Sequence, residues 1–294
     1  MSRPVLVLGA GGLVGSALAR AGGVTPLPRS ALDITDADAL ARALDDIQPE
    51  SVINAAAAAR VDEAERDPER AWAVNALAPA RLAALCARRE IRLLHLSTDY
   101  VLDEEGPGRA GEDCPPRPRS QYARSKLAGE VAALEAGALV VRVQWVYDPI
   151  HSGFFSRTLR ALAEGTPVRL VTDQVGSPTP AELLAEALLV AARPGPVGLY
   201  HLACTGEATP MSWIGTAATL LGLPLRAEPT TRAALGGAWR PARSLLDSAR
   251  FSQDFGLTLP PWELALGQVL NRRPPFRPGQ PISFSVAMMS ASEA

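Results

Sequence analysis

A tyrosine and a lysine four residues apart are the side chains of this chain best placed for proton transfer. Tyr122 and Lys126 stand in the run Tyr-Ala-Arg-Ser-Lys, and positions i and i+4 share one face of a helix. A phenol titrates at about pH 10, whereas a general acid works best near neutrality. An ammonium at about 4 Å stabilises the phenolate by roughly 4 kcal/mol at an effective dielectric of about 20, which lowers the pKa of the phenol by about three. The pair predicts a tyrosine whose pKa the lysine lowers, acting as general acid in the reduction of a carbonyl.

The lysine content of the chain supports a specific role for Lys126. The sequence holds 29 lysine and arginine residues, and Lys126 is the only lysine among them. A compact ammonium can approach a phenol and contact both hydroxyls of a ribose, which a planar guanidinium does less well. The alternative is an ordinary exposed pair on a helix, because tyrosine and lysine at this spacing form a weak motif by themselves.

Two hydroxyl side chains follow an apolar run and supply candidates for a third catalytic group. Ser97 and Thr98 end the run that starts near Leu93, and Asp99 comes next. The carboxyl edge of a parallel sheet is where such folds bind ligands. We expect Thr98 to hydrogen-bond the substrate carbonyl, with Ser97 as the competing candidate, although either hydroxyl could simply cap a loop. Asp99 is expected to bind a sugar hydroxyl.

A glycine-rich turn between an apolar run and an alanine-rich segment predicts a dinucleotide site. The glycines recur every third residue, which suits a tight turn, close approach of a diphosphate and close helix packing. The N–H groups at the start of the following helix favour an anion. A merely glycine-rich loop is the alternative. The residues of the turn assigned to the cofactor are Gly9, Gly12, Leu13, Val14 and Gly15.

The second predicted strand ends without the acidic residue that an NAD-selective enzyme would place at the adenosine ribose. The sequence there is Leu-Pro-Arg29-Ser30, and both side chains could accept a 2′-phosphate. NADPH is therefore favoured, and NADH is the alternative. Arg29 could instead be a solvated surface residue.

The elements that must position these residues alternate between short apolar runs and helical segments. This order predicts an α/β fold, a Rossmann-type doubly wound parallel sheet with a smaller C-terminal substrate lobe. Thr35 and Ser120 are expected to cap helices. The predicted strands are 4–9, 24–27, 51–54, 93–97 and 139–143, and the predicted helices are 13–20, 36–44, 71–89 and 120–135.

Prolines interrupt the alternating pattern after about residue 144 and suggest that the chain divides there into two parts. We expect a dinucleotide-binding domain over 1–143, with returning segments near 166–203. A substrate lobe is expected mainly over 144–272, and a poorly ordered tail over 273–294.

Composition excludes several classes of protein. The chain has 294 residues, 47% of them hydrophobic, and a net charge of -2, so neither a disordered protein nor a polynucleotide-binding one is expected. Three widely spaced cysteines argue against a disulfide framework. No apolar run is long enough for a signal peptide or membrane span. We expect a soluble, cytoplasmic protein, and its three histidines suggest packing rather than a metal triplet.

The motifs together resemble the dTDP-4-dehydrorhamnose reductase family, in the extended branch of the short-chain dehydrogenase/reductase superfamily. The resemblance covers roughly residues 4 to 270. Besides the glycine turn, it rests on Leu32-Asp-Ile-Thr35, Val52-Ile-Asn-Ala-Ala56, Val61-Asp-Glu-Ala-Glu65, Ser97-Thr-Asp-Tyr-Val101, Ser125-Lys-Leu-Ala-Gly-Glu130, Trp145-Val-Tyr147, Asp173-Gln-Val-Gly-Ser-Pro-Thr179, Gly198-Leu-Tyr-His-Leu202, Arg240-Pro241 and Leu259-Pro-Pro-Trp262.

The resemblance implies reduction of the C4 keto group of a nucleotide-linked deoxysugar, with hydride supplied by a nicotinamide. It implies Thr98, Tyr122 and Lys126 as catalytic residues, and it leaves a homodimer open. The further cofactor residues it implies are Asp33, Ile34, Ala55, Ala56 and Asn75. The substrate residues expected are Asp99, Val101, Gln144, Trp145, Gln174 and Arg240.

Departures from the family pattern bear on substrate and metal. Gln144 and Arg243 replace smaller or neutral residues and are expected where sugar or diphosphate would lie. Gln121 and Ala123 flank the tyrosine where the family has valine and glycine. Some members bind a metal through a carboxylate at the position of Ala17, so no metal site is expected here.

Two other functions share these motifs. A nucleotide-sugar epimerase or dehydratase has the same glycines and the same tyrosine and lysine, although a dehydratase would carry an acidic pair after Thr98 rather than Asp99 and Tyr100. A regulatory subunit without catalysis is the alternative from another class, because relatives of the family serve as partner subunits of a methionine adenosyltransferase. The intact Thr98, Tyr122 and Lys126 argue against it.

Overall fold

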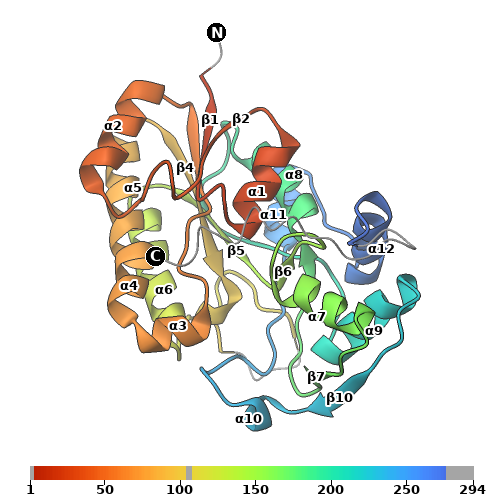
Figure 1. The fold of residues 1–294 in the computed structure, drawn as a ribbon. Coiled ribbons are helices and arrows are strands. Elements are labelled where there is room, and N and C mark those ends of the chain that lie inside the picture. Colours follow the sequence, from red (N-terminus) through yellow and green to blue (C-terminus); the bar gives the residue numbers. More distant parts are fainter. Residues whose placement is uncertain (1–2, 104–107, 276–294) are drawn as a thin grey trace.

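A parallel sheet of six strands forms the centre of the protein in a computed structural model, which describes residues 3–103 and 108–275 (Figure 1). The strands lie in the order β2-β1-β3-β4-β5-β9, and every neighbouring pair is parallel. The predicted doubly wound α/β fold is confirmed. The strands are β1 (Val5–Leu8), β2 (Val24–Leu27), β3 (Ser51–Asn54), β4 (Arg92–Thr98), β5 (Leu139–Val143) and β9 (Gly198–Leu202).

Alternating apolar residues of the strands build one core on each face of the sheet. In β1, Leu6 and Leu8 pack on one face and Val7 packs on the other, as the period of two in a strand requires. The helices α2 (Ala37–Ile47) and α5 (Ala78–Arg88) cover the first face, with α6 (Gln121–Glu135) beside α5. The helices α1 (Leu13–Ala21) and α8 (Ala181–Ala191) cover the second.

The helix predicted over 71–89 is interrupted and starts earlier. The structure has α3 (Val61–Arg66), α4 (Pro68–Trp72), a π turn (Ala73–Leu77) and then α5. Proline occupies the first position of α4, and the Asp67 carboxylate accepts the Arg70 N–H at 3.0 Å, which is a strong start signal that the apolar pattern does not contain.

One of the two predicted helix caps is wrong. Ser120 caps α6 through its hydroxyl, as expected. Asp36, and not Thr35, caps α2 by accepting the Ala39 N–H at 2.9 Å. Thr35 instead donates its hydroxyl to Asp33 at 2.7 Å, because the preceding turn already presents a stronger acceptor.

The second lobe is built from short strands and helices beside the carboxyl edge of the sheet (Figure 1). Its core is aromatic, with Tyr147, Phe155 and Trp213 packed together. Residues 276–294 of the expected tail lie outside the described residues. The remaining elements are β6 (Val146–Tyr147), α7 (Phe154–Ala163), β7 (Val168–Val171), β8 (Thr179–Pro180), α9 (Pro210–Leu220), β10 (Ala227–Thr230), α10 (Arg232–Leu235), α11 (Ala249–Phe255), α12 (Trp262–Arg272) and a 3₁₀ turn at Asp99–Val101.

Candidate active site

The turn after β1 has the shape of a cradle for a diphosphate. Gly9 has a φ of +74°, and a Cβ there would lie 2.6 Å from the backbone of Ala56. A Cβ on Gly15 would lie 2.2 Å from the Gly9 carbonyl oxygen. Gly12 caps α1 without a side-chain hydrogen bond, so no side chain of the cap satisfies the first N–H groups of that helix. Close backbone packing and unsatisfied amides both fit the phosphates of a dinucleotide.

Asn75 holds the loop after β3 against α6. Its Oδ1 accepts the Ala58 N–H at 2.9 Å, and its Nδ2 donates to the Ala58 carbonyl at 3.2 Å and to the Ser125 hydroxyl at 3.1 Å. The side chain is fully buried. Asn75 thereby fixes the segment that contains Ala55 and Ala56, which adjoins the glycine turn.

A cation and a carboxylate lie together at the end of β2. Arg29 Nε is 3.2 Å from Asp33 Oδ2, and the two side chains are 67% and 37% exposed. Hydrogen bonds from Thr35 lower the pKa of Asp33, with a smaller contribution from Arg29. Ile34 is buried in the core beside α2 rather than on the surface. The Arg29 guanidinium is accessible to a ligand at this corner.

Thr98, Tyr122 and Lys126 converge at the carboxyl end of β4. Tyr122 and Lys126 are both buried on one face of α6, and the Thr98 side chain hydrogen-bonds that of Tyr122. Lys126 Nζ donates to the Leu96 carbonyl oxygen at 2.6 Å. The ring of Tyr100 meets that of Tyr122 edge-on, with centroids 5.7 Å apart.

The expected lowering of the Tyr122 pKa by Lys126 is wrong. Burial raises the pKa of Tyr122 to about 12, although the hydrogen bond with Thr98 acts in the opposite direction. Burial also lowers the pKa of Lys126 to about 8, against the attraction of Glu130. The ammonium is directed at a backbone carbonyl, and desolvation of the phenolate dominates. Tyr122 therefore remains a neutral phenol at physiological pH, which is the form that can donate a proton.

The structure separates the two candidate hydroxyls. Ser97 Oγ donates to Glu130 Oε2 at 2.6 Å, and Glu130 forms a buried ion pair with Arg142, whose Nε lies 2.9 Å from the same oxygen. Ser97 is thus committed to a structural network behind the site, and Thr98 is the hydroxyl that reaches Tyr122. Glu130 lies eight residues after Tyr122 on α6, and therefore four residues after Lys126. This spacing could have indicated that Glu130 shares a helix face with Lys126.

Asp99 is buried and hydrogen-bonded to two neighbouring hydroxyl groups. Its side chain is 2% exposed, and it accepts the Thr98 hydroxyl at 3.0 Å and a short hydrogen bond from the Ser244 hydroxyl. Burial raises its pKa to about 6, although these hydrogen bonds oppose the shift. Both of its oxygens have partners within the protein, and the binding of a sugar hydroxyl by Asp99 stays a prediction.

Two further expected substrate residues, together with Arg243, lie outside the lining of the cavity described below, and their contact with a substrate stays a prediction. Val101 is fully buried in a small apolar cluster. Gln144 is 1% exposed, and its Oε1 accepts the Leu246 N–H at 2.7 Å. Arg243 pairs with Glu207 and does not line the cavity described below. Gln144 and Arg243 have polar partners that are distant in sequence, whereas Val101 contributes apolar packing.

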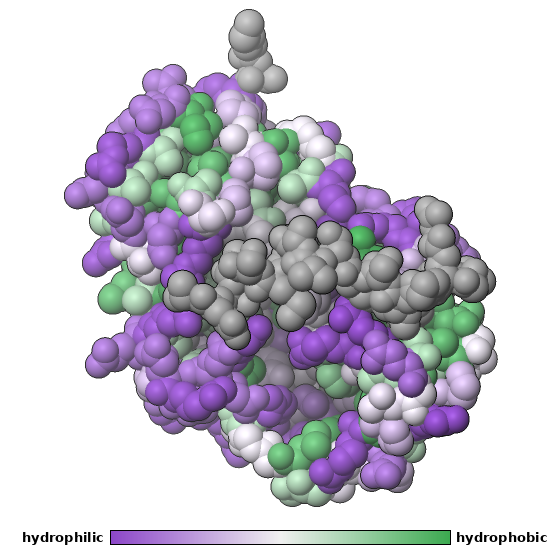
Figure 2. All heavy atoms as spheres, in the orientation of Figure 1, coloured by the Kyte–Doolittle hydropathy of each residue, from purple (hydrophilic) through white to green (hydrophobic). Residues whose placement is uncertain are grey.

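A cavity of about 1010 Å³ opens between the sheet edge and the second lobe, and Figure 2 shows hydrophilic side chains around the hollow on this face. Three expected substrate residues line it, namely Trp145, Gln174 and Arg240. Trp145 has a φ of +42°, and a Cβ on Gly176 would lie 2.2 Å from its ring, so close packing fixes this unusual backbone. Tyr100 lines the cavity and connects it to Tyr122.

The cavity also contains charged residues that the sequence analysis missed. Asp62 Oδ2 accepts Arg240 Nη2 at 2.6 Å, and Asp173 holds the backbone N–H of Arg232 at 2.8 Å. Asp62 lies in the motif Val61–Glu65 that contributes to the family resemblance, but its role could not be read from the sequence because its partner is 178 residues away. The additional charged residues that line the cavity are Asp62, Asp148, Arg157, Arg169, Asp173 and Arg232.

The histidines form no cluster. His95 is buried beside Asn54, at 3.1 Å, and burial holds its pKa well below the ordinary value. His201 is buried against the Ala110 carbonyl, and His151 lies in the loop after β6. Within residues 3–103 and 108–275 there is no group of three or more histidine, cysteine or acidic residues arranged to hold a metal. Nor does any helix in these ranges combine the length and the apolar character needed to span a membrane.

Comparison with known proteins gives one consistent result. The family model described as "RmlD substrate binding domain" matches residues 2–274. A dTDP-4-dehydrorhamnose reductase of Streptomyces griseus is 40% identical over 276 residues, which cover 89% of this chain and 91% of the relative. The reductase of the same name from Escherichia coli K12 is 35% identical over 257 residues, with 81% and 85% covered. The crystal structure of a Bacillus anthracis dTDP-4-dehydrorhamnose reductase in complex with NADP superposes with a TM-score of 0.87 at 26% identity, and covers 92% of this chain and 99% of that one.

Proposed function

The chain belongs to the RmlD substrate binding domain family, together with the dTDP-4-dehydrorhamnose reductases it resembles, and on this premise we propose that it reduces the 4-keto group of a nucleotide-linked deoxysugar with NADPH. The observation that carries the proposal is the hydrogen bond between Thr98 and Tyr122 at the carboxyl end of β4, with Lys126 on the same face of α6. The ring of Tyr100, which lines the large cavity, separates this arrangement from it and packs edge-on against Tyr122.

Tyr122 is the proton donor in the proposed reaction. NADPH, held by the glycine turn and Arg29, would provide the hydride for the sugar C4. As negative charge develops on the carbonyl oxygen, the Tyr122 hydroxyl donates its proton to that oxygen. The Thr98 hydroxyl has a single proton, which it donates to Asp99 in the free protein, and it turns from Asp99 to donate a hydrogen bond to the same substrate oxygen. A phenol with a pKa of about 12 remains a stronger acid than the alcohol being formed, so the transfer is favourable despite the burial of the ring.

Lys126 and Asp99 position the two hydroxyls. Lys126 is anchored on the Leu96 carbonyl oxygen at 2.6 Å, which directs its ammonium to the edge where the nicotinamide ribose would lie. Asp99 accepts the Thr98 hydroxyl at 3.0 Å and so holds that side chain beside Tyr122. Both roles depend on close placement, which is a major source of rate enhancement.

Arg29 is proposed to select the cofactor. Its guanidinium is 67% exposed at the end of β2 and is held by Asp33 at 3.2 Å. A 2′-phosphate is a bidentate acceptor that suits a guanidinium. Arg29→Ala should therefore raise the KM for NADPH and leave that for NADH nearly unchanged.

Product analysis tests the proposed function. Purified protein is incubated with dTDP-4-dehydrorhamnose and NADPH, cofactor oxidation is followed at about 340 nm, and the sugar nucleotide is identified by NMR. One NADPH should be oxidised for each alcohol formed. Isomerisation of the sugar without net oxidation of the cofactor would indicate an epimerase, whereas binding of NADPH without turnover of keto-sugar nucleotides would indicate a regulatory subunit.

A further inference from the structure

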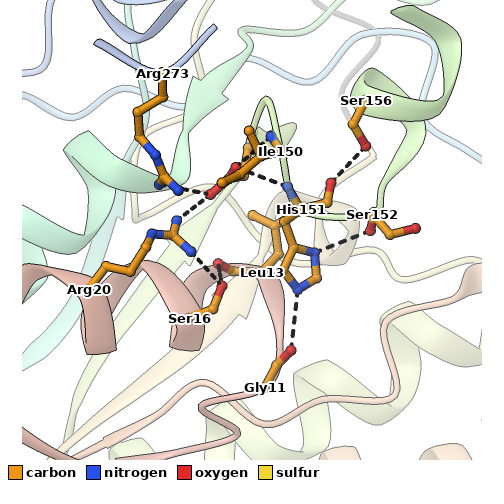
Figure 3. A network of polar contacts seen from close by, with 10 residues as sticks. Gly11, Leu13, Ser16, Arg20, Ile150, His151, Ser152, Ser156 and Arg273 are labelled. Carbon is orange, nitrogen blue, oxygen red and sulfur yellow. Dashed lines mark hydrogen bonds and ion pairs between the residues drawn. The ribbon is translucent and has the colours of Figure 1, made fainter. Parts of the chain in front are cut away.

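The loop between β6 and α7, residues 148–153, connects the second lobe to the phosphate-binding turn. Its anchor is Asp148, whose side chain is 2% exposed. Asp148 Oδ1 accepts the N–H groups of Ile150 at 2.9 Å and His151 at 3.1 Å. Its other oxygen receives Arg20 of α1 and Arg273 at the end of α12, the latter at 3.8 Å. In Figure 3 the guanidinium groups of Arg20 and Arg273 both point toward the loop at Ile150.

His151 lies between this anchor and the glycine turn, with its ring pointing at the turn (Figure 3). Its Nε2 is 3.2 Å from the Gly11 carbonyl oxygen, and its Nδ1 is 3.2 Å from the Ser152 carbonyl oxygen. A carbonyl oxygen can only accept a hydrogen bond, so each contact needs an N–H on the ring. A neutral imidazole carries one N–H and an imidazolium carries two. Only the cation can make both contacts at once.

The position of the ring places this charge beside the cofactor site. Gly11 directly precedes Gly12, the cap of α1, whose first amides face the diphosphate of a bound dinucleotide. The charged groups at the anchor of this loop are Asp148 itself and its two ion-pair partners, Arg20 on α1 and Arg273 after α12. The first charged residue of α7 is the cationic Arg157. Because two guanidiniums already bind Asp148, that carboxylate leaves the imidazolium available to a phosphate.

We propose that His151 is a cofactor-positioning residue: its imidazolium holds the phosphate-binding turn at Gly11 and adds a positive charge beside the diphosphate of the dinucleotide. The inference rests on the proposed function only in taking a nicotinamide dinucleotide as the ligand. The end of the loop also lies close to α1, because a Cβ added at Gly153 would be 3.8 Å from a methyl carbon of Leu13. The consequence is that cofactor affinity depends on the protonation of His151.

Fluorescence titration with NADH at about pH 6 and pH 8, the range over which histidine changes charge, tests this dependence. NADH is chosen because the 2′-phosphate of NADPH itself titrates at about pH 6. The wild-type Kd should be about three- to fivefold weaker at pH 8 than at pH 6, the size expected for a partly exposed charge contact. His151→Gln should bind weakly at both pH values, and His151→Lys should bind tightly at both.

Arg193→Gln is the matched control, because it removes an exposed positive charge at the far end of α8 and should keep the wild-type pH dependence. If His151→Gln retains the wild-type affinities and the wild-type pH dependence, the inference is overturned. The keto-sugar assay gives a separate readout of the proposed function. Binding that follows protonation of His151 without any keto-sugar turnover would support this inference and refute the proposed function, whereas normal turnover with pH-independent binding would do the reverse.

Discussion

At the scale of single residues, the site depends on a hydroxyl that burial keeps protonated. Tyr122 has a pKa raised to about 12 and shares a hydrogen bond with Thr98. Replacing its hydroxyl by hydrogen removes the proton donor and leaves the packing of the ring against Tyr100 intact. The chemistry and the fold can therefore be separated at this position.

Tyr122→Phe should lower kcat by a factor of about 10² to 10⁴, the usual contribution of a general acid, and leave the Kd for NADPH within about twofold. Single-turnover reduction and fluorescence titration measure the two quantities. A variant that retained more than about a tenth of the wild-type kcat would contradict the assigned role.

Lys126 should make the catalytic rate fall at alkaline pH. Burial lowers its pKa to about 8, so its ammonium is charged below this pH and becomes neutral as the pH rises through it. Because the charge is proposed to hold the nicotinamide ribose, kcat/KM should fall above about pH 8, since this ratio reports the groups of the enzyme form that binds the varied substrate.

Lys126→Arg keeps the charge to much higher pH but changes the shape of the side chain. Its activity should be lower at every pH, because a planar fork replaces a buried ammonium that is 3% exposed, and the fall above about pH 8 should disappear. Full activity of this variant would show that the shape of the lysine does not matter.

At the scale of elements, α6 is held in place by its close approach to the π turn Ala73–Leu77. A Cβ on Gly129 would lie 2.1 Å from the Asn75 carbonyl oxygen, and Asn75 in turn holds the loop at Ala58 and the hydroxyl of Ser125. The position of Tyr122 and the position of the loop after β3 therefore depend on the close packing of α6 against the π turn.

Gly129→Ala should lower the free energy of unfolding by about 1–3 kcal/mol through overpacking, as measured by urea denaturation. Gly267→Ala in α12 is its control, because a Cβ there meets nothing within 4 Å and should be neutral or stabilising by up to about 1 kcal/mol. Equal unfolding midpoints for the two variants would show that α6 does not need this close approach.

At the scale of the whole molecule, residues remote in sequence close the cavity from both sides. Asp62 of α3 accepts Arg240 Nη2 at 2.6 Å and the Ala238 N–H at 2.7 Å, and these contacts lower its pKa. The carboxylate thereby ties the segment after α10 to the dinucleotide-binding half and keeps Arg240 on the cavity wall.

Asp62→Asn should raise the KM for the sugar nucleotide about three- to tenfold, the effect of weakening a hydrogen bond to a charged group, with the Kd for NADPH unchanged. Steady-state kinetics with each substrate varied in turn provide the measurement. Glu63→Gln, one residue further along α3 and paired only with the exposed Arg60 in the described structure, should match the wild type. A wild-type KM for the sugar nucleotide in Asp62→Asn would show that the contact between Asp62 and Arg240 does not support substrate binding.

The sequence by itself determined the features that depend on neighbouring residues. Strand β1 and the glycine turn are local patterns, and the fixed pitch of a helix places Tyr122 and Lys126 on one face. The order of strands and helices was likewise enough for the class of fold, because short crossover connections allow few arrangements of a parallel sheet.

Only the tertiary structure decided what depends on burial and on partners distant in sequence. The direction of the Tyr122 pKa shift was predicted wrongly, because a charge at helical spacing is readable from the sequence but desolvation is not. The choice of Thr98 over Ser97 depended on Glu130, 33 residues after Ser97, and the structural role of Gln144 depended on Leu246, 102 residues away. Such contacts exist only once the chain has folded, so no local pattern encodes them.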